Sequence, residues 1–196
     1  GFRLGKDSMT LTAKAYIKNE TPDYYLQRYT SNHYQWSNDF SKTYRFYVGG
    51  EIAYPTQWVK PKLNVSFENI TNHIYFGNQG MPQQHSGNIQ VLAADLQLNI
   101  TTPWVNLENS IVYQHSSSAN LPLPALTLYN NLYYHDTWVK ALDVQIGVDM
   151  RFFTKYYAPI LNPALGQFCV QNQEQVGNYP VMNVYANFYV KHIRLK

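Results

Sequence analysis

Ten charged side chains of both signs occur in stretches where polar and apolar residues alternate. A charge removed from water without a partner is costly, so these groups either contact water or form ion pairs. In the first case they line a water-filled path and bias which solutes pass along it. In the second they pair inside a plugged interior. The candidate pore-lining residues are Lys14, Arg45, Glu51, Glu68, Asp95, Glu108, Asp143, Asp149, Arg151 and Lys191.

Uncharged polar residues dominate the remaining positions of the same polar rows. They are mostly Asn, Gln and Tyr, which favours the water-filled path over the plugged interior. Tyr rings beside Asn and Asp groups also suit sugar rings, so passage of sugars is an alternative. Tyr-rich faces also occur for purely structural reasons, and these interpretations stay open at this point.

A histidine beside three serines, in the segment 113–118, is the arrangement most like a nucleophilic site. A Ser–His pair needs hydrogen-bond contact and a third group that orients the imidazole. If a strand continues through His115 and Ser116, their side chains point to opposite faces. A histidine at the end of a strand is therefore the better interpretation, and the sequence predicts no catalytic residues and no enzyme.

Metal and cofactor motifs are missing from the sequence. None of the six His residues has the i, i+4 spacing of a helical metal pair, and Cys169 has no second Cys with which to form an intrachain disulfide. There is no Gly-rich phosphate loop. A net charge of +3 without a basic run argues against nucleic acid as a partner. We expect no metal and no cofactor.

The segment 141–157 indicates which elements position the charges. Every even position from Leu142 to Phe152 is apolar, whereas Asp143, Asp149 and Arg151 stand at odd positions. A strand places successive side chains on opposite faces, so one face is apolar and the other is polar. A helix would mix the two sets. The alternation lasts about as long as the ~9–11 residues with which a tilted strand crosses a bilayer.

Similar alternation predicts eight strands in the whole chain. In the second, Gly49 and Gly50 indicate a bend or a bulge. In the third, which starts at Lys62 after a turn bracketed by Pro55 and Pro61, the alternation is lost in the segment 69–73. The expected bounds are 8–18 for the first strand, 43–54 for the second, and 88–101, 105–115, 123–136, 142–152 and 179–191 for the fourth to the eighth.

The connections between these strands are expected to be alternately long and short. The long ones include the segments 19–42, 77–87, 116–122 and 158–177. The short turns carry Trp58, Trp104 and Trp138. Tryptophan prefers the headgroup level of a membrane, so the three would form an aromatic belt on one rim. The alternative is that they are ordinary aromatic residues at strand ends.

Composition is consistent with a transmembrane β-barrel. Charged residues are 14% of the 196, against about 25% in ordinary soluble domains, and aromatic residues are 16%. No apolar run approaches the ~18 residues of a membrane helix. The final predicted strand ends in His-Ile-Arg-Leu-Lys rather than on an aromatic residue. We therefore expect residues 1–196 to be a single segment of a larger barrel.

Several motifs of the chain resemble a known family. The longest is Gly147–Pro159, with the sequence GVDMRFFTKYYAP, followed by Asn162-Pro163, Gly166-Gln167-Phe168, Gln171 and Gly177-Asn178-Tyr179-Pro180; Ser31–Trp36, Ile74–Phe76 and Pro82-Gln83 also match. These segments resemble the putative porin family of Bacteroidetes outer membranes. The resemblance implies a porin-like β-barrel and a position toward the C-terminal end of a longer protein.

These observations together predict an all-β, antiparallel, up-and-down transmembrane barrel of about eight visible strands. The expected function is a porin-like channel for passive diffusion of small hydrophilic solutes in the bacterial outer membrane. The expected partners are the lipid bilayer, lipopolysaccharide, small hydrophilic solutes and other outer-membrane proteins. One alternative is a non-conducting scaffold that binds a partner through its outer loops. The other is a soluble β-sandwich that binds carbohydrate.

Overall fold

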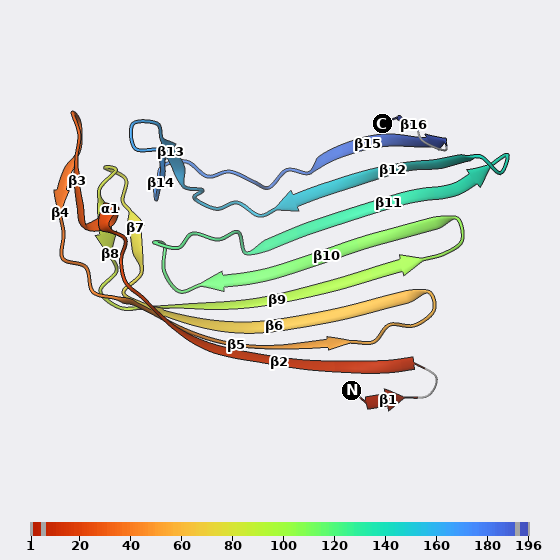
Figure 1. Cartoon of the computed structure of the whole chain (residues 1–196), viewed down its shortest axis with the longest axis horizontal. Helices are drawn as coiled ribbons and strands as arrows, with labels where there is room; N and C mark the ends of the chain where they lie inside the picture. Colours follow the sequence, from red (N-terminus) through yellow and green to blue (C-terminus); the bar gives the residue numbers. More distant parts are fainter. Residues whose placement is uncertain (1, 5–6, 191–192, 196) are drawn as a thin grey trace.

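The computed structural model describes residues 2–4, 7–190 and 193–195, and most of them form one antiparallel sheet (Figure 1). Its strands follow the order β1-β2-β5-β6-β9-β10-β11-β12-β15-β16. Two three-residue strands, β1 (Phe2–Leu4) and β16 (Ile193–Leu195), form its edges, and the sheet is not closed on itself within the described residues. The eight long strands are β2 (Asp7–Glu20), β5 (Thr43–Ala53), β6 (Val59–Thr71), β9 (Asn88–Thr101), β10 (Val105–Ser116), β11 (Leu126–Trp138), β12 (Leu142–Phe153) and β15 (Val181–Val190).

The eight long strands confirm the predicted all-β antiparallel fold, with two local corrections. Strand β6 begins before Pro61 and keeps its register through the segment 69–71; it ends at Thr71, and the next residue, Asn72, has a φ of 59°. Asn tolerates this left-handed conformation better than most residues. Strand β5 has no bulge at Gly49 and Gly50, which pair regularly with Lys14 and Ala13.

The pairing register places the predicted apolar rows on one common face of the sheet. Residues directly opposite each other in an antiparallel pair lie on the same face, so a face can be followed from strand to strand. One such row crosses seven strands without a polar residue. It runs through Leu11, Ile52, Leu63, Leu96, Ile111, Leu128 and Phe152.

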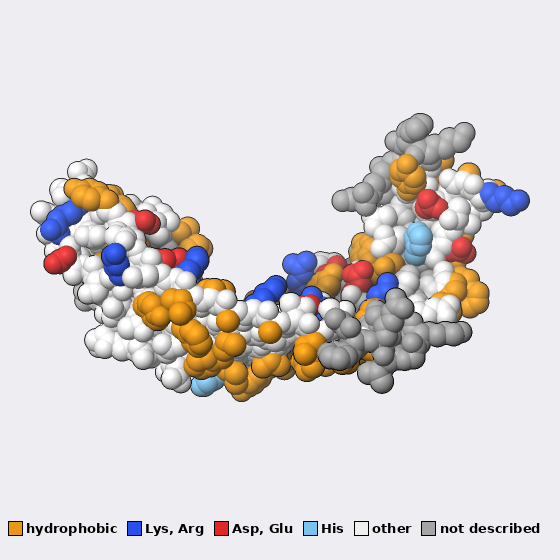
Figure 2. Space-filling model, turned by 60° about the horizontal axis from the view of Figure 1, so that its bottom comes forward, with side chains coloured by type: hydrophobic (Ala, Val, Ile, Leu, Met, Phe, Trp, Pro, Cys, Tyr) orange, Lys and Arg blue, Asp and Glu red, His pale blue; other side chains and the backbone are white. Residues whose placement is uncertain are grey.

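Much of this apolar face is exposed. Ile146 and Val148 in β12 are 43% and 37% exposed, and Val184 in β15 is 79% exposed. Val144, which lies on the same face opposite Phe188, is an exception because it is buried. The sheet curves into an open trough, with apolar side chains along its convex outer surface and charged ones inside it (Figure 2).

The two ends of the sheet differ in the length of their connections (Figure 1). Short turns join β5 to β6, β9 to β10 and β11 to β12 at one end. The three Trp residues lie at this end: Trp58 and Trp104 precede β6 and β10, and Trp138 ends β11. The Trp58 carbonyl accepts from the Thr101 amide at 2.8 Å, and the Trp104 carbonyl from the His135 amide at 2.9 Å. Their membrane role stays a prediction.

The long connections at the opposite end carry further structure that the sequence did not predict. We call the residues 21–42, 72–87 and 154–180 the cap. The four-residue helix α1 (Tyr24–Gln27) is in the cap, and no helix of the described residues is long and apolar enough to cross a membrane. The cap strands are β3 (Arg28–Thr30), β4 (Gln35–Ser37), β7 (Ile74–Phe76), β8 (Pro82–Gln84), β13 (Ile160–Asn162) and β14 (Gln167–Cys169).

One buried side chain from each of the three cap segments forms a small core. Trp36, Phe76 and Cys169 pack together, and partly buried residues including Tyr25 and Tyr29 surround them. The Trp36 indole stacks on Tyr29 with ring centroids 4.6 Å apart. Its Nε1 donates to the Tyr25 carbonyl at 2.8 Å. The cap is therefore a folded unit with its own apolar centre rather than a set of separate loops.

Backbone and amide contacts also join the three cap segments. Strand β14 pairs in parallel with β7 at Cys169 and Phe76, and the Val170 amide donates to the Phe76 carbonyl at 2.7 Å. The Asn162 amide donates to the Tyr34 hydroxyl at 2.8 Å. The Gln84 side chain donates to the Ser41 carbonyl at 2.7 Å. Segments more than a hundred residues apart in sequence thus depend on one another for their conformation.

Replacing the central Trp of the cap should release the cap while leaving the sheet intact. Trp36 is 4% exposed, so Trp36→Ala leaves a cavity that costs about 3–5 kcal/mol. Limited proteolysis should then cut within residues 21–42 and 154–180 far faster than in the parent protein. The control Trp104→Ala, at a 65% exposed site, should leave the cutting pattern unchanged. If the protease cuts Trp36→Ala no faster than the parent protein, the packing of the cap around Trp36 is contradicted.

Candidate functional site

The polar concave face of the sheet is the candidate functional site. Its rows are fixed by the same register as the apolar rows, because odd and even positions alternate between faces. Lys191 lies outside the described residues. The other nine predicted charged residues lie on the concave face: Lys14, Arg45, Glu51, Glu68, Asp95, Glu108, Asp143, Asp149 and Arg151.

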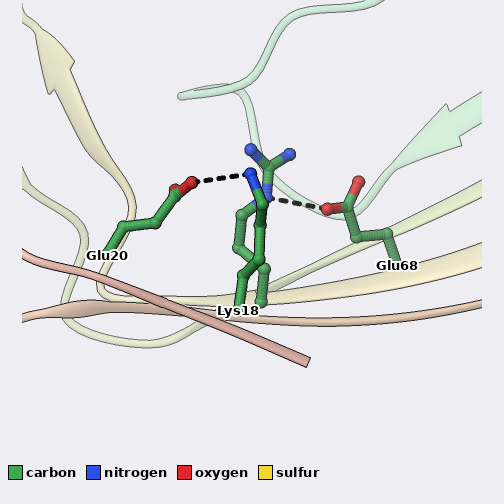
Figure 3. Close-up of polar contacts among 4 residues, drawn as sticks. Lys18, Glu20 and Glu68 are labelled. Carbon is green, nitrogen blue, oxygen red and sulfur yellow. Dashed lines mark hydrogen bonds and ion pairs between the residues drawn. The ribbon is translucent and has the colours of Figure 1, made fainter. Parts of the chain in front are cut away.

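Basic and acidic side chains pair on strands β2, β5 and β6. The Arg45 Nε donates to the Glu68 Oε1 at 2.7 Å, from the neighbouring strand. The Lys62 Nζ lies 2.9 Å from the Glu51 Oε2. Near the cap, the Lys18 Nζ donates to the Glu20 Oε1 at 3.0 Å, with Glu68 on the other side (Figure 3). On these three strands, charges of opposite sign form ion pairs, as the interpretation of a plugged interior expects.

Lys62 was not among the predicted site residues. It alternates with Leu63 in the sequence and lies opposite Ala53 and Gln97 on the concave face. The predicted third strand already began at Lys62, directly after Pro61. The alternation of Leu63 and Asn64 places Lys62 on the polar face, so this residue could have been found from the sequence.

Acidic side chains on β9, β10 and β12 have neutral partners instead of basic ones. The Asp95 carboxylate accepts from Gln97 at 2.8 Å and from Ser110 at 3.1 Å. Asp143 accepts from the Thr137 hydroxyl at 2.6 Å, and Asp149 accepts from the Asn183 amide at 3.0 Å. Within the described part of the chain, none of these carboxylates lies within ion-pair distance of a Lys or Arg. Their negative charge is therefore not neutralised locally.

A hydrogen-bond network crosses strands β10, β11, β12 and β15 on the same face. Glu108 accepts from the Asn131 amide at 3.3 Å, and Asn131 in turn accepts from the Tyr185 hydroxyl at 2.8 Å. Gln145 donates to that hydroxyl at 3.5 Å and accepts from Asn187 at 3.3 Å. The network holds these polar groups in fixed positions on the concave side.

Gly147 makes room for this network. A Cβ at position 147 would lie 2.6 Å from the Tyr185 hydroxyl and 2.7 Å from the Cβ of Tyr133. The two Tyr side chains can therefore lie across β12 only because residue 147 has no side chain. A related arrangement occurs at Gly49, where a Cβ would lie 2.6 Å from the Tyr47 hydroxyl.

Among the described residues, Arg151 is the one predicted basic residue on the part of the face formed by β9, β10 and β12. Its guanidinium carbon lies 5.7 Å from the centre of the Tyr129 ring, within the range of a cation–π contact. Because Arg151 contacts the face of a ring, its guanidinium N–H donors remain available to water or to a solute. Both signs of charge are thus present on this side, with the acidic sign in excess.

A cavity of about 820 Å³ lies where the cap meets the concave face. Arg45, Glu68 and Ile70 from the sheet line it, together with His73 and residues 20–23. Burial lowers the pKa of His73, and the positive charge of Arg45 and the nearby His85 lower it further. A histidine with this shift is mainly neutral near pH 7, so Arg45 is the principal positive charge at this junction.

The two residues considered for catalysis diverge. Strand β10 continues to Ser116, so His115, opposite Leu92, lies on the convex face and Ser116, opposite Val91, on the concave face. The Ser116 hydroxyl donates to the Ser118 carbonyl at 3.1 Å. Among residues 2–4, 7–190 and 193–195, no group of three His, Cys, Asp or Glu side chains could hold a metal ion.

A family model described as "Putative porin" matches residues 1–195, which is nearly the whole chain. No curated protein matches the sequence.

Filling the space at Gly147 should destabilise the sheet. Gly147→Ala forces Tyr133 or Tyr185 out of place, which should lower the free energy of unfolding by about 1–3 kcal/mol. Denaturant unfolding of the purified protein measures this change. Gly50→Ala is the matched control, because a Cβ at position 50 meets nothing within 4 Å. It should leave stability unchanged or raise it by up to ~1 kcal/mol. Equal effects at both positions would contradict the packing described.

Proposed function

The chain belongs to the putative porin family, and on that premise we propose that it forms part of the wall of an outer-membrane β-barrel. The barrel conducts small hydrophilic solutes by passive diffusion. The concave face lines the water-filled lumen, and the convex face contacts the hydrocarbon of the bilayer. The two open edges of the sheet would pair with further strands of the barrel.

The observation that carries the proposal is the continuous apolar row across seven strands. Exposed apolar patches of this extent mark surfaces that another apolar phase covers. The long strands have 10 to 14 residues, which meets the ~9–11 that a tilted strand needs to cross the hydrocarbon layer. Backbone groups within a sheet are paired, as lipid requires.

The orientation follows from the two ends of the sheet. In bacterial barrels the short turns face the periplasm and the long loops face the outside. We therefore place the turns that carry Trp58, Trp104 and Trp138 at the periplasmic side, where the indoles form an interfacial belt. The cap lies at the outer mouth, in contact with lipopolysaccharide, and the predicted loops 19–42 and 158–177, which contribute to it, narrow the entrance. The sequence resemblance favours a Bacteroidetes origin.

The lumen in this proposal weakly prefers cations. The ion pairs on β5 and β6 cancel much of the charge there, whereas Asp95, Glu108 and Asp149 keep their negative charge. A ring or patch of one sign biases which ions enter a pore. Arg151 opposes the bias from the same side. No step of covalent catalysis is involved.

A second candidate function is a non-conducting scaffold that binds a partner protein through its outer surface. The folded cap favours this alternative, because its aromatic core and interlocked segments give it a defined outer surface. Planar-bilayer recording of the full-length protein separates the two functions. Steps of ionic current support the channel, and their absence at any voltage favours the scaffold.

Ion selectivity tests the assignment of the lumen face. A unit charge about 10 Å from an ion in water contributes about 0.4 kcal/mol, or roughly a twofold change in relative permeability. Asp149→Asn should therefore lower the ratio of potassium to chloride permeability by about twofold, and Arg151→Gln should raise it. Reversal potentials in a salt gradient across a planar bilayer measure the ratio.

The control for this experiment is Asp136→Asn. Asp136 lies opposite Val144, on the convex face, so its charge does not border the proposed lumen. Its removal should leave the permeability ratio as it is in the parent protein. If the permeability ratio does not change in Asp149→Asn and Arg151→Gln, or if it changes in Asp136→Asn, a lining role for the concave face is contradicted.

A further inference from the structure

A second cavity, of about 560 Å³, lies between the cap and the loop that joins β10 to β11. Its volume falls in the range of about 300–1,000 Å³ typical of small-ligand sites. Three walls line it: residues 114–123 with Ala125, four residues between 75 and 83 of the second cap segment, and residues 155–157, 170–172 and 175 of the third. None of the nine charged residues on the concave face lines it, and neither does Trp58, Trp104 or Trp138.

The chemistry of the lining is neutral and rich in amides. Lys155 is its one lysine or arginine, and no carboxylate of the described residues borders it. A cationic ligand would therefore have no acidic partner there, and a polyanion would have too few basic partners. Seven amide side chains line it: Asn78, Gln83, Gln114, Asn120, Gln171, Asn172 and Gln175.

Several of these amides are free to bind a ligand. The side chains of Asn78, Gln114, Asn172 and Gln175 make no hydrogen bond within the described part of the chain. Each amide offers two donors and an acceptor, which suits a ligand that carries many hydroxyl groups. Tyr75, Tyr156 and Tyr157 border the same space, and an aromatic ring offers an apolar face to the C–H side of a sugar ring.

The walls are held in place by bonds that do not use the free amides. On one side, the Ser117 hydroxyl accepts from the backbone N–H of Gln90 at 2.8 Å, and the Ser118 hydroxyl accepts from the backbone N–H of Asn120 at 3.2 Å. On the other side, Gln171 donates to the carbonyls of Ala158 and Glu174 at 2.7 and 2.6 Å. A cavity with fixed walls loses little conformational entropy when a ligand binds.

We propose that this cavity binds a neutral oligosaccharide at the outer mouth of the protein, through the free amides of residues 114, 172 and 175. The site borders the cap end of the concave face through Gln114 and Ser116, and it includes none of the charged residues that line the proposed lumen. A neutral polar peptide is the competing ligand class, because peptide groups also pair with amides. The rings of Tyr75, Tyr156 and Tyr157 favour the sugar.

Isothermal titration calorimetry of the full-length protein in an amine-oxide detergent tests the proposal. A maltoside detergent is avoided because its headgroup is itself a sugar. The probes are maltohexaose, cellohexaose and mannohexaose, with an acidic galacturonate hexamer and a Ser-Gly hexapeptide for comparison. At least one neutral hexasaccharide should bind at millimolar concentration and more tightly than the acidic hexamer or the peptide. If none binds, or only the peptide or the acidic hexamer does, the proposal is overturned.

Variants locate the binding. Asn172→Ala combined with Gln175→Ala, and separately Gln114→Ala from the opposite wall, should each weaken hexasaccharide binding by about tenfold or more. These side chains form no hydrogen bonds within the described residues, so their loss should not unfold the cap. Asn64→Ala on the concave face is the matched control and should bind as the parent does. Binding that survives both cavity variants would place the sugar elsewhere and overturn the assignment.

Discussion

A sheet with one largely apolar face depends on a second apolar phase to cover that face. Burying apolar surface contributes about 25 cal/mol per Å², so side chains such as Ile52, Leu96 and Leu128 are costly to leave in water. Within the described residues, the convex face has no second sheet or helix packed against it, because the other strands all lie in the cap. Hydrocarbon chains supply the missing cover in our account. The strand lengths, the polar concave face and the position of the Trp residues all follow from that single constraint.

The cap holds the long loops in defined positions at one end of the sheet. Loops of this length are costly to order unless their own contacts compensate. Here Trp36, Phe76 and Cys169, one from each loop, form a shared apolar centre. The same packing creates two cavities of different character. One borders the charged pair Arg45 and Glu68, and the other is neutral and rich in amides.

Sequence reasoning identified the sheet well because strand alternation is a local signal. Strand β9 has the predicted bounds, residues 88–101, and the other long strands differ by a few residues at their ends. Prediction was wrong where a proline or glycine pair suggested an interruption, at Pro61 and at Gly49, because tertiary pairing overrides such preferences. The cap was missed since its contacts join distant residues, as Asn162 and Tyr34 do. The division of the polar face into paired and unpaired charges depends on strand register, which alternation alone does not supply.

Site-directed spin labelling along β12 in lipid vesicles tests the central claim most directly. Nitroxides are placed one at a time at residues 145–151, and their collisions with oxygen and with a water-soluble nickel complex are measured. The account predicts a period of two: labels at Ile146, Val148 and Met150 meet oxygen in the lipid, whereas those at Gln145, Asp149 and Arg151 meet nickel in water. Labels at the even positions that are shielded from both reagents, or that collide freely with nickel, would contradict it.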